Sequence, residues 1–253
     1  MANYTTLSAL FTAVANAIRA KTGGSATIVA DDFPTEIAAI PSIVTQLCDQ
    51  DNTKDITFPA VTTLRQVLSG FGASGSWFTR KIVIPSGVAT IAALFVNDVF
   101  RYANGELRIP ATVSSIGQSA FYNYGRYGSG ISLYIEGGSV GLEIARYGFQ
   151  DVRLVSAYLP ARITAIGYTS WQYAFNNCTY LETVTIEDGW DTYLDLTWSP
   201  ITLESITSII TAWKDNPTNS LALSTASYAL YTADATAVAA AAAKGLTVTT
   251  IAR

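Results

Sequence analysis

Histidine is absent from this chain of 253 residues. Its absence excludes Ser-His-Asp and Cys-His nucleophile systems, histidine-ligated zinc, haem held by histidine, and the usual general base near neutral pH. An enzyme of this composition would have to use carboxylate or lysine chemistry. No phosphate-binding loop or metal-ligand spacing is present either, so we expect no cofactor and no metal site.

Cysteine is scarce, since the chain has only Cys48 and Cys178. Neither belongs to a C-x-x-C pair, so a disulfide framework is not expected. The N-terminal residues lack the basic and apolar segments of a secretory signal, and no window reaches the roughly 20 apolar residues of a membrane span. We expect the protein to fold in a cytoplasm without inserting into a membrane.

Charge is also low, at 13% of the residues against about 25% in ordinary domains. The 15 basic and 19 acidic side chains give a formal net charge of −4. A nucleic-acid partner is not expected, because neutralising phosphates requires a clustered basic surface. Hydrophobic residues, in contrast, reach 49% and can bury a large core.

A repeat of 24 to 27 residues organises the middle of the chain. Short apolar stretches end at hydrophobic residues with this spacing, namely Phe58, Ile84, Ile109, Ile135, Leu159 and Ile186. One strand per unit cannot bury its own apolar faces, so stacked units are expected to pair into a parallel ladder around one core. Each unit is expected to return through a compact helix or loop. A β-sandwich with strands of similar spacing is the alternative.

The units share the phrase I-P-x-x-V-x-x-I-x-x-x-A-F, which is fullest between Leu159 and Ile186. This phrase resembles the bacterial leucine-rich repeats of the BspA-like type. The resemblance implies an α/β fold, a leucine-rich-repeat solenoid with a parallel β ladder, preceded by a small N-terminal helical segment. It also makes Cys178 a buried ladder residue, the alternative being a reactive thiol. The unit that begins at Ile135 departs from the phrase, because Glu136 and Gly137 replace its proline.

We expect three parts, an N-terminal helical attachment segment over 1–43, the solenoid over 44–190, and a strand-helix continuation and cap over 191–253. The last part alternates strands with helices, which is typical of parallel pairing in one sheet. Its expected elements are a strand over 193–198, a helix with Ile206, Ile209, Ile210 and Trp213 on one face, a strand over 221–223, a helix over 227–244 and a strand over 246–251.

The N-terminal segment has one apolar helix face, formed by Leu7, Leu10, Phe11, Val14 and Ile18. Such a face must pack on something, either on the solenoid or on a partner. The phrase over residues 17–40 is similar to a segment in structural proteins of phages and prophages of Gram-positive bacteria. That resemblance implies attachment to other virion proteins through this segment.

Two groups of carboxylates could support chemistry. Asp49, Asp51 and Asp55 lack the glycine and the final glutamate of a calcium-binding EF-hand loop, so a solvated connector is favoured. The turn at 187–191 holds Glu187, Asp188 and Asp191. There, a glycosidase pair is the alternative to carboxylates that solvate the bend.

Aromatic residues are plentiful, with 14 Tyr and 5 Trp. Two insertions that lengthen the regular unit hold Tyr122, Tyr124 and Tyr127, and then Tyr168, Trp171 and Tyr173. We expect these insertions to point outward, where tyrosine and tryptophan suit recognition of sugars or protein surfaces. They are the candidate receptor-binding residues. Packing against the coil edge or a neighbouring subunit is equally open.

These observations favour a non-enzymatic phage virion protein that displays an adhesion surface as a tail fibre, baseplate or capsid-decoration component. It would be assembled in the host cytoplasm and then reside in the virion. The expected partners are other virion proteins, further copies of the chain, and a host surface protein or glycan. A bacterial cell-surface adhesin is the alternative, and a carboxylate-based carbohydrate-active enzyme is the third hypothesis.

Overall fold

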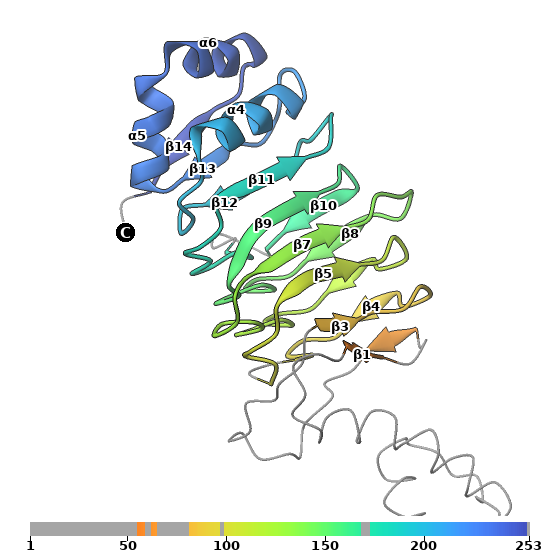
Figure 1. The fold of residues 1–253 in the computed structure, drawn as a ribbon. Coiled ribbons are helices and arrows are strands. Elements are labelled where there is room, and N and C mark those ends of the chain that lie inside the picture. The colour runs from red at the N-terminus through yellow and green to blue at the C-terminus, as the bar shows by residue number, and fades with distance from the viewer. Residues whose placement is uncertain (1–54, 59–61, 65–80, 97–98, 168–172, 252–253) are drawn as a thin grey trace, which may run out of the picture. The chain divides into compact units, whose positions relative to one another are not determined.

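The computed structural model describes residues 55–58, 62–64, 81–96, 99–167 and 173–251. These residues all belong to one compact unit, Gln46–Arg253. Figure 1 shows them as a stack of coils that ends in a group of helices. The expected attachment face, Leu7, Leu10, Phe11, Val14 and Ile18, lies outside the described residues and stays a prediction, as do the three domain boundaries.

The expected parallel ladder is present. Its main sheet has the order β11-β9-β7-β5, formed by β5 (Gly105–Ile109), β7 (Ile131–Ile135), β9 (Leu154–Leu159) and β11 (Thr183–Ile186). The register places Ile109 opposite Ile135 and Leu159 opposite Ile186. Because side chains alternate along a strand, the residues that define the repeat all enter the interior. The period of the sequence is therefore the length of one coil.

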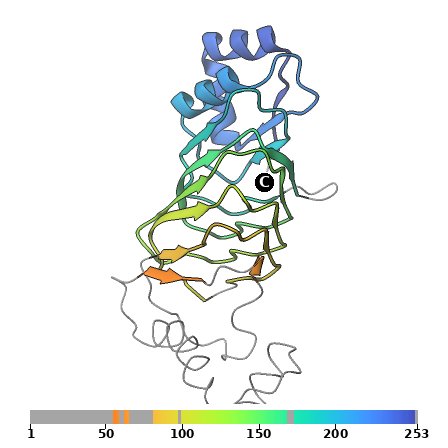
Figure 2. The ribbon, with the colours of Figure 1, turned by 90° about the vertical axis from the view of Figure 1, so that its right-hand side faces the viewer.

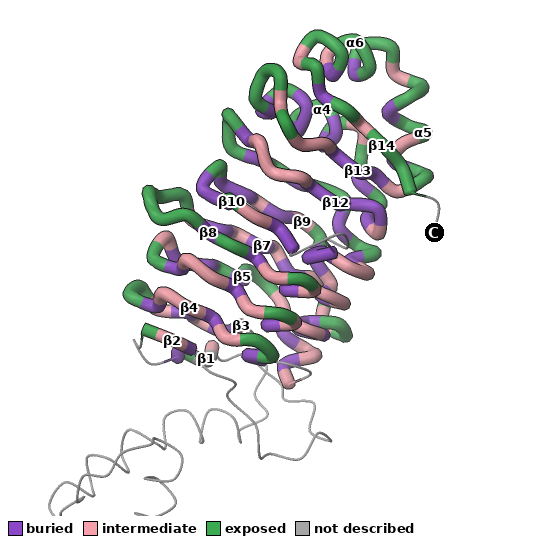
Figure 3. Tube along the Cα trace, turned by 180° about the vertical axis from the view of Figure 1, so that it is seen from behind, coloured by how far each residue is buried: buried purple, intermediate pink, exposed green. Residues whose placement is uncertain are grey.

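Each coil contains a second strand, which the sequence did not indicate. These strands are β2 (Thr63–Leu64), β4 (Thr90–Ile91), β6 (Ser115–Ile116), β8 (Leu142–Ile144) and β10 (Ile163–Ile166), and they form a five-stranded parallel sheet. Several of them can be followed from coil to coil in Figure 3. The return was expected to be a compact helix or loop, and in the described coils it is a loop that contains this short strand rather than a helix. A return of this length satisfies its backbone groups by pairing with neighbouring coils rather than within a helix.

A column of phenylalanines fills the interior behind the turn that follows each second strand. Phe121 and Phe149 stack with ring centroids 5.2 Å apart and Phe149 and Phe175 at 5.6 Å, while Phe95 meets Phe121 edge-on at 5.9 Å. All four side chains are buried. The phenylalanine of the A-F pair in the repeat phrase thus fills the core at this side of each coil.

Close contact between coil backbones imposes glycine at position 117, as it does at position 128. A Cβ added to Gly117 would lie 2.3 Å from the backbone nitrogen of Ala93 in the preceding coil. No other residue fits without moving that coil. Two residues beyond each phenylalanine of the later coils the chain turns through the left-handed region, with Asn123, Asp151 and Asn177 at φ values of 60°, 57° and 56°. Asn and Asp tolerate this conformation better than most residues.

Arg162 holds the turns of three coils together from inside. Its guanidinium donates hydrogen bonds to the carbonyl oxygens of Val113 at 2.7 Å, Pro110 at 3.1 Å, Glu136 at 2.6 Å and Val140 at 3.1 Å. Arg162 is only 8% exposed. Burial lowers the pKa of Arg162 from its usual value, partly opposed by the carboxylate of Glu136. Four hydrogen bonds from one guanidinium therefore replace water at the turn carbonyls.

The main ladder is interrupted near its first coils. β1 (Asp55–Thr57) and β3 (Lys81–Val83) pair in a two-stranded sheet of their own. In the described part of the chain no backbone hydrogen bond joins β3 to β5, and the backbone N–H of Ile82 instead donates to the hydroxyl of Tyr124 at 3.1 Å. The second ladder continues across the same level, from β2 to β10.

The C-terminal part contains β12 (Leu194–Leu196), α4 (Leu203–Ala212), β13 (Leu221–Leu223), α5 (Thr225–Ala233), α6 (Ala235–Lys244) and β14 (Val248–Thr250). Its strands form a separate parallel sheet in the order β12-β13-β14, which corrects the expectation of one continuous sheet. The helix expected over 227–244 is two helices, because Asp234 ends α5 and caps α6 by accepting from the N–H of Ala237 at 2.8 Å. None of the described helices is long and apolar enough to cross a membrane.

Helix α4 covers the last strand of the main ladder. The hydroxyl of Ser205 accepts from the N–H of Val184 at 2.8 Å and donates to its carbonyl at 3.0 Å. The Ser205 side chain thereby satisfies the two backbone groups of Val184 that a neighbouring strand would otherwise bond. The edge of β11 is protected from pairing with another chain at this point. Figure 2 shows the helices gathered beyond the final coils.

Candidate ligand-binding groove

The candidate receptor-binding aromatics do not share one environment. Tyr127 is 51% exposed and Tyr122 is half-buried, so the expectation of outward loops holds for these two. Tyr124 is fully buried and Tyr173 is buried at 9% exposure, which corrects the expectation for both. Tyr168 and Trp171 lie outside the described residues.

Tyr124 is buried because its insertion folds back onto the preceding coil. The N–H groups of Gly125 and Tyr127 donate to the carbonyls of Phe100 and Arg101 at 2.9 and 2.7 Å. The ring of Tyr124 then meets Phe121 edge-on, with centroids 6.2 Å apart. Burial raises the pKa of Tyr124 far above its ordinary value. This tyrosine is a structural residue that completes the ladder.

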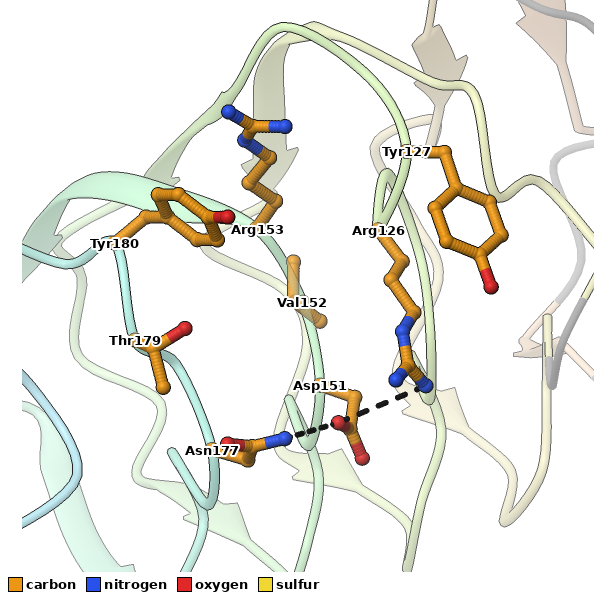
Figure 4. Close-up of a pocket in the computed structure, with 8 residues that line it drawn as sticks. All are labelled: Arg126, Tyr127, Asp151, Val152, Arg153, Asn177, Thr179 and Tyr180. Carbon is orange, nitrogen blue, oxygen red and sulfur yellow. Dashed lines mark hydrogen bonds and ion pairs between the residues drawn. The ribbon is translucent and has the colours of Figure 1, made fainter.

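A groove with a volume of about 400 Å³ lies on the turn side of the solenoid. We call it the Arg–Tyr groove. Three consecutive coils contribute to it through their turns, and Figure 4 shows its lining residues, Arg126, Tyr127, Asp151, Val152, Arg153, Asn177, Thr179 and Tyr180. Its volume falls within the range of small-ligand pockets.

One end of the groove is held by a polar chain of side chains. The amide of Asn177 donates to the carboxylate of Asp151, and the guanidinium of Arg126 lies 3.8 Å from that carboxylate and donates to the side-chain oxygen of Asn123 at 2.7 Å. Dashed lines at the base of Figure 4 mark the contacts of Asp151 with Asn177 and with Arg126. They fix Arg126 while leaving 42% of its side chain exposed.

At the other end, Arg153 and Tyr180 face each other. The guanidinium carbon of Arg153 lies 4.2 Å from the centre of the Tyr180 ring, a cation–π contact. The Nε atom of Arg153 is buried and has no hydrogen-bond partner. Tyr180 is 50% exposed. This pair presents a rigid aromatic face beside a guanidinium without a carboxylate partner.

The charges that line the groove do not balance. Two guanidinium groups, Arg126 and Arg153, face one carboxylate, Asp151, and that carboxylate is already bound by Asn177 and Arg126. Tyr127 adds further cation–π contacts with Arg101 and Arg126, each at 5.9 Å. The groove is therefore locally positive on a chain whose formal net charge is −4.

The outer face of the main ladder holds a second arginine and tyrosine pair, but the arginine of this pair has a carboxylate partner. Arg108 lies 4.7 Å over the ring of Tyr134, which stacks on Tyr158 at 5.0 Å. Here Glu136 accepts from the guanidinium at 2.6 Å. This hydrogen bond, supported by one from the N–H of Ala111, lowers the pKa of Glu136. The ladder pair is consequently neutralised, unlike the pair in the groove.

Of the four described carboxylates considered as a calcium loop or a glycosidase pair, Asp55, Glu187 and Asp191 have structural contacts, and Asp188 is exposed. Asp191 binds the ammonium of Lys214 and the N–H of Thr218, both at 3.0 Å. Burial alone would raise the pKa of Asp191, but these bonds outweigh it and lower the value. Asp55 pairs with Lys81 at 3.9 Å, whereas Asp49 and Asp51 lie outside the described residues. Within the described ranges, no three His, Cys, Asp or Glu side chains gather as a metal site.

Cys178 is a buried interior residue, as the repeat phrase predicted. Its thiol donates to the carbonyl of Phe149 at 3.2 Å. Burial raises the pKa of Cys178 far above its ordinary value, with a further contribution from Asp151. A thiol in this state is a poor nucleophile.

Sequence reasoning missed most of the groove, although a signal was present. The pair Arg101 and Tyr102 recurs as Arg126 and Tyr127, and Arg153 is followed at the same coil spacing by Tyr180. The repeat places side chains of equal phase side by side on successive coils. Tracking polar residues through the period would have identified the groove.

The chain matches the family model described as BspA type Leucine rich repeat region, in six copies over residues 74–129 and 95–215. Together these ranges cover more than half of the chain and include every residue that lines the Arg–Tyr groove. No curated protein and no solved structure was found to match the chain.

Proposed function

Because the chain belongs to the BspA-type leucine-rich repeat family, we propose that it is an adhesion protein whose solenoid binds a receptor at a cell surface. Solenoids of this family are typically non-enzymatic scaffolds for interaction, and stacked coils present an extended surface. The observation that supports the proposal most directly is the Arg–Tyr groove. Exposed tyrosine and arginine are the side chains most enriched at recognition sites.

We further propose that the protein works as part of a phage virion, as a tail fibre, baseplate or capsid-decoration component. Support comes from the phrase over residues 17–40, which resembles phage structural proteins, and from its position before the repeats. Several copies on one particle would multiply weak contacts into firm attachment. A bacterial cell-surface adhesin is an equally compatible setting for the same solenoid.

The virion setting is tested by mass spectrometry of purified particles combined with deletion of residues 1–41. The proposal expects the full chain in the particles and loss of the truncated chain from them. A matched control is the full chain with the groove variant Arg153→Gln, which should still be incorporated. Particles without the protein, together with its detection on cells that produce no phage, would instead establish the cell-surface adhesin.

The adhesion function is tested separately by the binding of labelled full-length protein to candidate host cells. Saturable binding that unlabelled protein displaces is expected. The adhesion function would be refuted if the protein bound saturably to none of the host cells tested, whether they are candidate phage hosts or candidate partners of a bacterial adhesin.

A further inference from the structure

We propose that the Arg–Tyr groove binds a negatively charged saccharide, that is, a sugar unit with a carboxylate or phosphate group. This inference rests on the proposed adhesion function and specifies the receptor chemistry. It comes from three properties of the groove: its size, its hydrogen-bonding walls and its unbalanced charge.

The size of the groove selects a compact unit. A volume of about 400 Å³ suits a small ligand or one segment of a polymer rather than the broad contact of a folded protein. The groove crosses three coils, so its walls are held by paired strands and stacked phenylalanines. A rigid site needs little reordering when a ligand binds.

The walls suit a sugar ring. Tyr180 offers a half-exposed aromatic face on which the apolar side of a pyranose can stack, and its neighbour Thr179 supplies an exposed hydroxyl. The amide of Asn177 lies at the base of the groove, below Thr179, where it donates to Asp151. Buried Val152 lines the groove between these groups. This combination of one aromatic face with several short polar side chains matches the alternation of apolar and hydroxyl surface on a sugar.

The charge of the groove favours an anionic group on that sugar. Arg153 has an aromatic partner but no carboxylate, and its Nε lacks an acceptor. A carboxylate or phosphate beside Tyr180 would accept from the terminal Nη groups of this guanidinium, since its Nε is buried. Arg108 on the ladder face has the same aromatic contact, but Glu136 already occupies its guanidinium. Of these two arginines, Arg153 is therefore the one whose guanidinium is open to an anionic ligand.

The experiment measures binding of defined oligosaccharides to the full chain by isothermal titration calorimetry. The probes are a galacturonic acid trisaccharide, a trisaccharide with a terminal sugar phosphate, neutral galactotriose, and a hexaglutamate peptide. Binding of at least one anionic saccharide is expected at least about tenfold tighter than binding of galactotriose, since one charge-assisted contact is worth about that factor. Higher salt should weaken the binding of the anionic saccharide. The two anionic probes distinguish a carboxylate from a phosphate receptor.

Variants locate the binding. Arg153→Gln and Tyr180→Ser change exposed or half-exposed groove side chains, and each should weaken the anionic saccharide at least about tenfold. Arg108→Gln removes the matched arginine on the ladder face and should leave the affinity within about twofold. Circular dichroism checks that each variant is folded, and retained affinity in both groove variants would overturn the inference.

The outcomes separate this inference from the proposed function. Equal binding of neutral and anionic sugars, tighter binding of hexaglutamate, or no saccharide binding by a chain that still binds host cells would each refute the saccharide assignment and leave adhesion intact. Groove-dependent saccharide binding by a chain that binds no host cell would support the site and refute adhesion.

Discussion

Arg162 provides the sharpest test of how the coils are held together. Replacing it with leucine keeps an aliphatic stem but removes the guanidinium that reaches the turns of two preceding coils. The carbonyl of Val113 would lose a buried donor, whereas the carbonyl of Pro110 would retain the N–H of Val113 as a partner. The carbonyls of Glu136 and Val140, where the bonds are only partly buried, can be reached by water.

The magnitude follows from this count. An orphaned buried carbonyl costs about 1–3 kcal/mol, and the three weakened carbonyls add a smaller amount, while release of a desolvated charge offsets part of the loss. We expect about 3 kcal/mol, which in a chain of this size lowers the thermal midpoint by roughly 6–12 °C. The assay is thermal unfolding followed by circular dichroism at neutral pH.

Two further variants test whether the hydrogen bonds of the guanidinium, rather than its charge alone, account for the loss of stability. Arg146→Leu removes an exposed guanidinium from a turn and should leave the midpoint within about 2 °C. Arg162→Lys keeps a positive charge but not the planar fork, so it should lose more than half as much stability as the leucine variant. An unchanged midpoint in Arg162→Leu would show that the turns hold without the guanidinium, and full rescue by lysine would show that charge alone suffices.

Three other predictions concern packing, thiol reactivity and pH. Gly117→Ala should destabilise the solenoid by about 1–3 kcal/mol in urea unfolding, because the new Cβ meets the backbone of the preceding coil. Cys178 should react with a disulfide reagent at pH 8 only as fast as the solenoid unfolds, measured by absorbance with and without urea, because burial suppresses its thiolate. Glu136 has a lowered pKa, so its stabilising effect is present above its ordinary pKa of 4.5 and is lost as pH falls through its lower folded-state value. Glu136→Gln should therefore flatten the acid side of the stability profile, measured by urea unfolding across this range.

Each of these predictions has a control. Gly137→Ala adds a Cβ that meets only a carboxylate oxygen at 3.9 Å, so it should be nearly neutral, and equal losses for both glycines would contradict the packing argument. A Cys48→Ser background makes the thiol signal specific, and rapid labelling of the folded chain would show that Cys178 is accessible. An unaltered acid profile in Glu136→Gln would mean that the carboxylate does not stabilise the fold.

The main ladder could be predicted because the hydrophobic residues that form it recur at a regular spacing in the sequence. Residues such as Ile109 and Ile135 recur at the coil length and must face one core, so their spacing alone specifies parallel pairing. The second ladder escaped prediction because β4 and β6 have only two residues each, too few to show alternation. Pairing across coils, rather than local propensity, makes these short segments strands.

The candidate site was harder to predict because exposure depends on how an insertion folds. Tyr124 and Tyr127 are three residues apart in one insertion, yet one is buried and the other is half exposed. Two backbone hydrogen bonds to the preceding coil decide between them, and no local pattern reveals those bonds. Arg153 and Tyr180 were overlooked because they lie in different coils and become neighbours only when the repeat is stacked.

The break between β3 and β5 has a mechanical consequence. Between the coils of β5, β7 and β9, an axial load would be shared between two ladders of backbone hydrogen bonds. At the level of β3 and β5, the second ladder, the hydrogen bonds between neighbouring turns and the Tyr124 hydroxyl carry it without the main ladder. Tension should therefore separate the stack at this level before it separates the coils of β5, β7 and β9. The Arg–Tyr groove lies wholly within those later coils. A solenoid pulled along its axis would thus separate at its first coils while the groove stays folded.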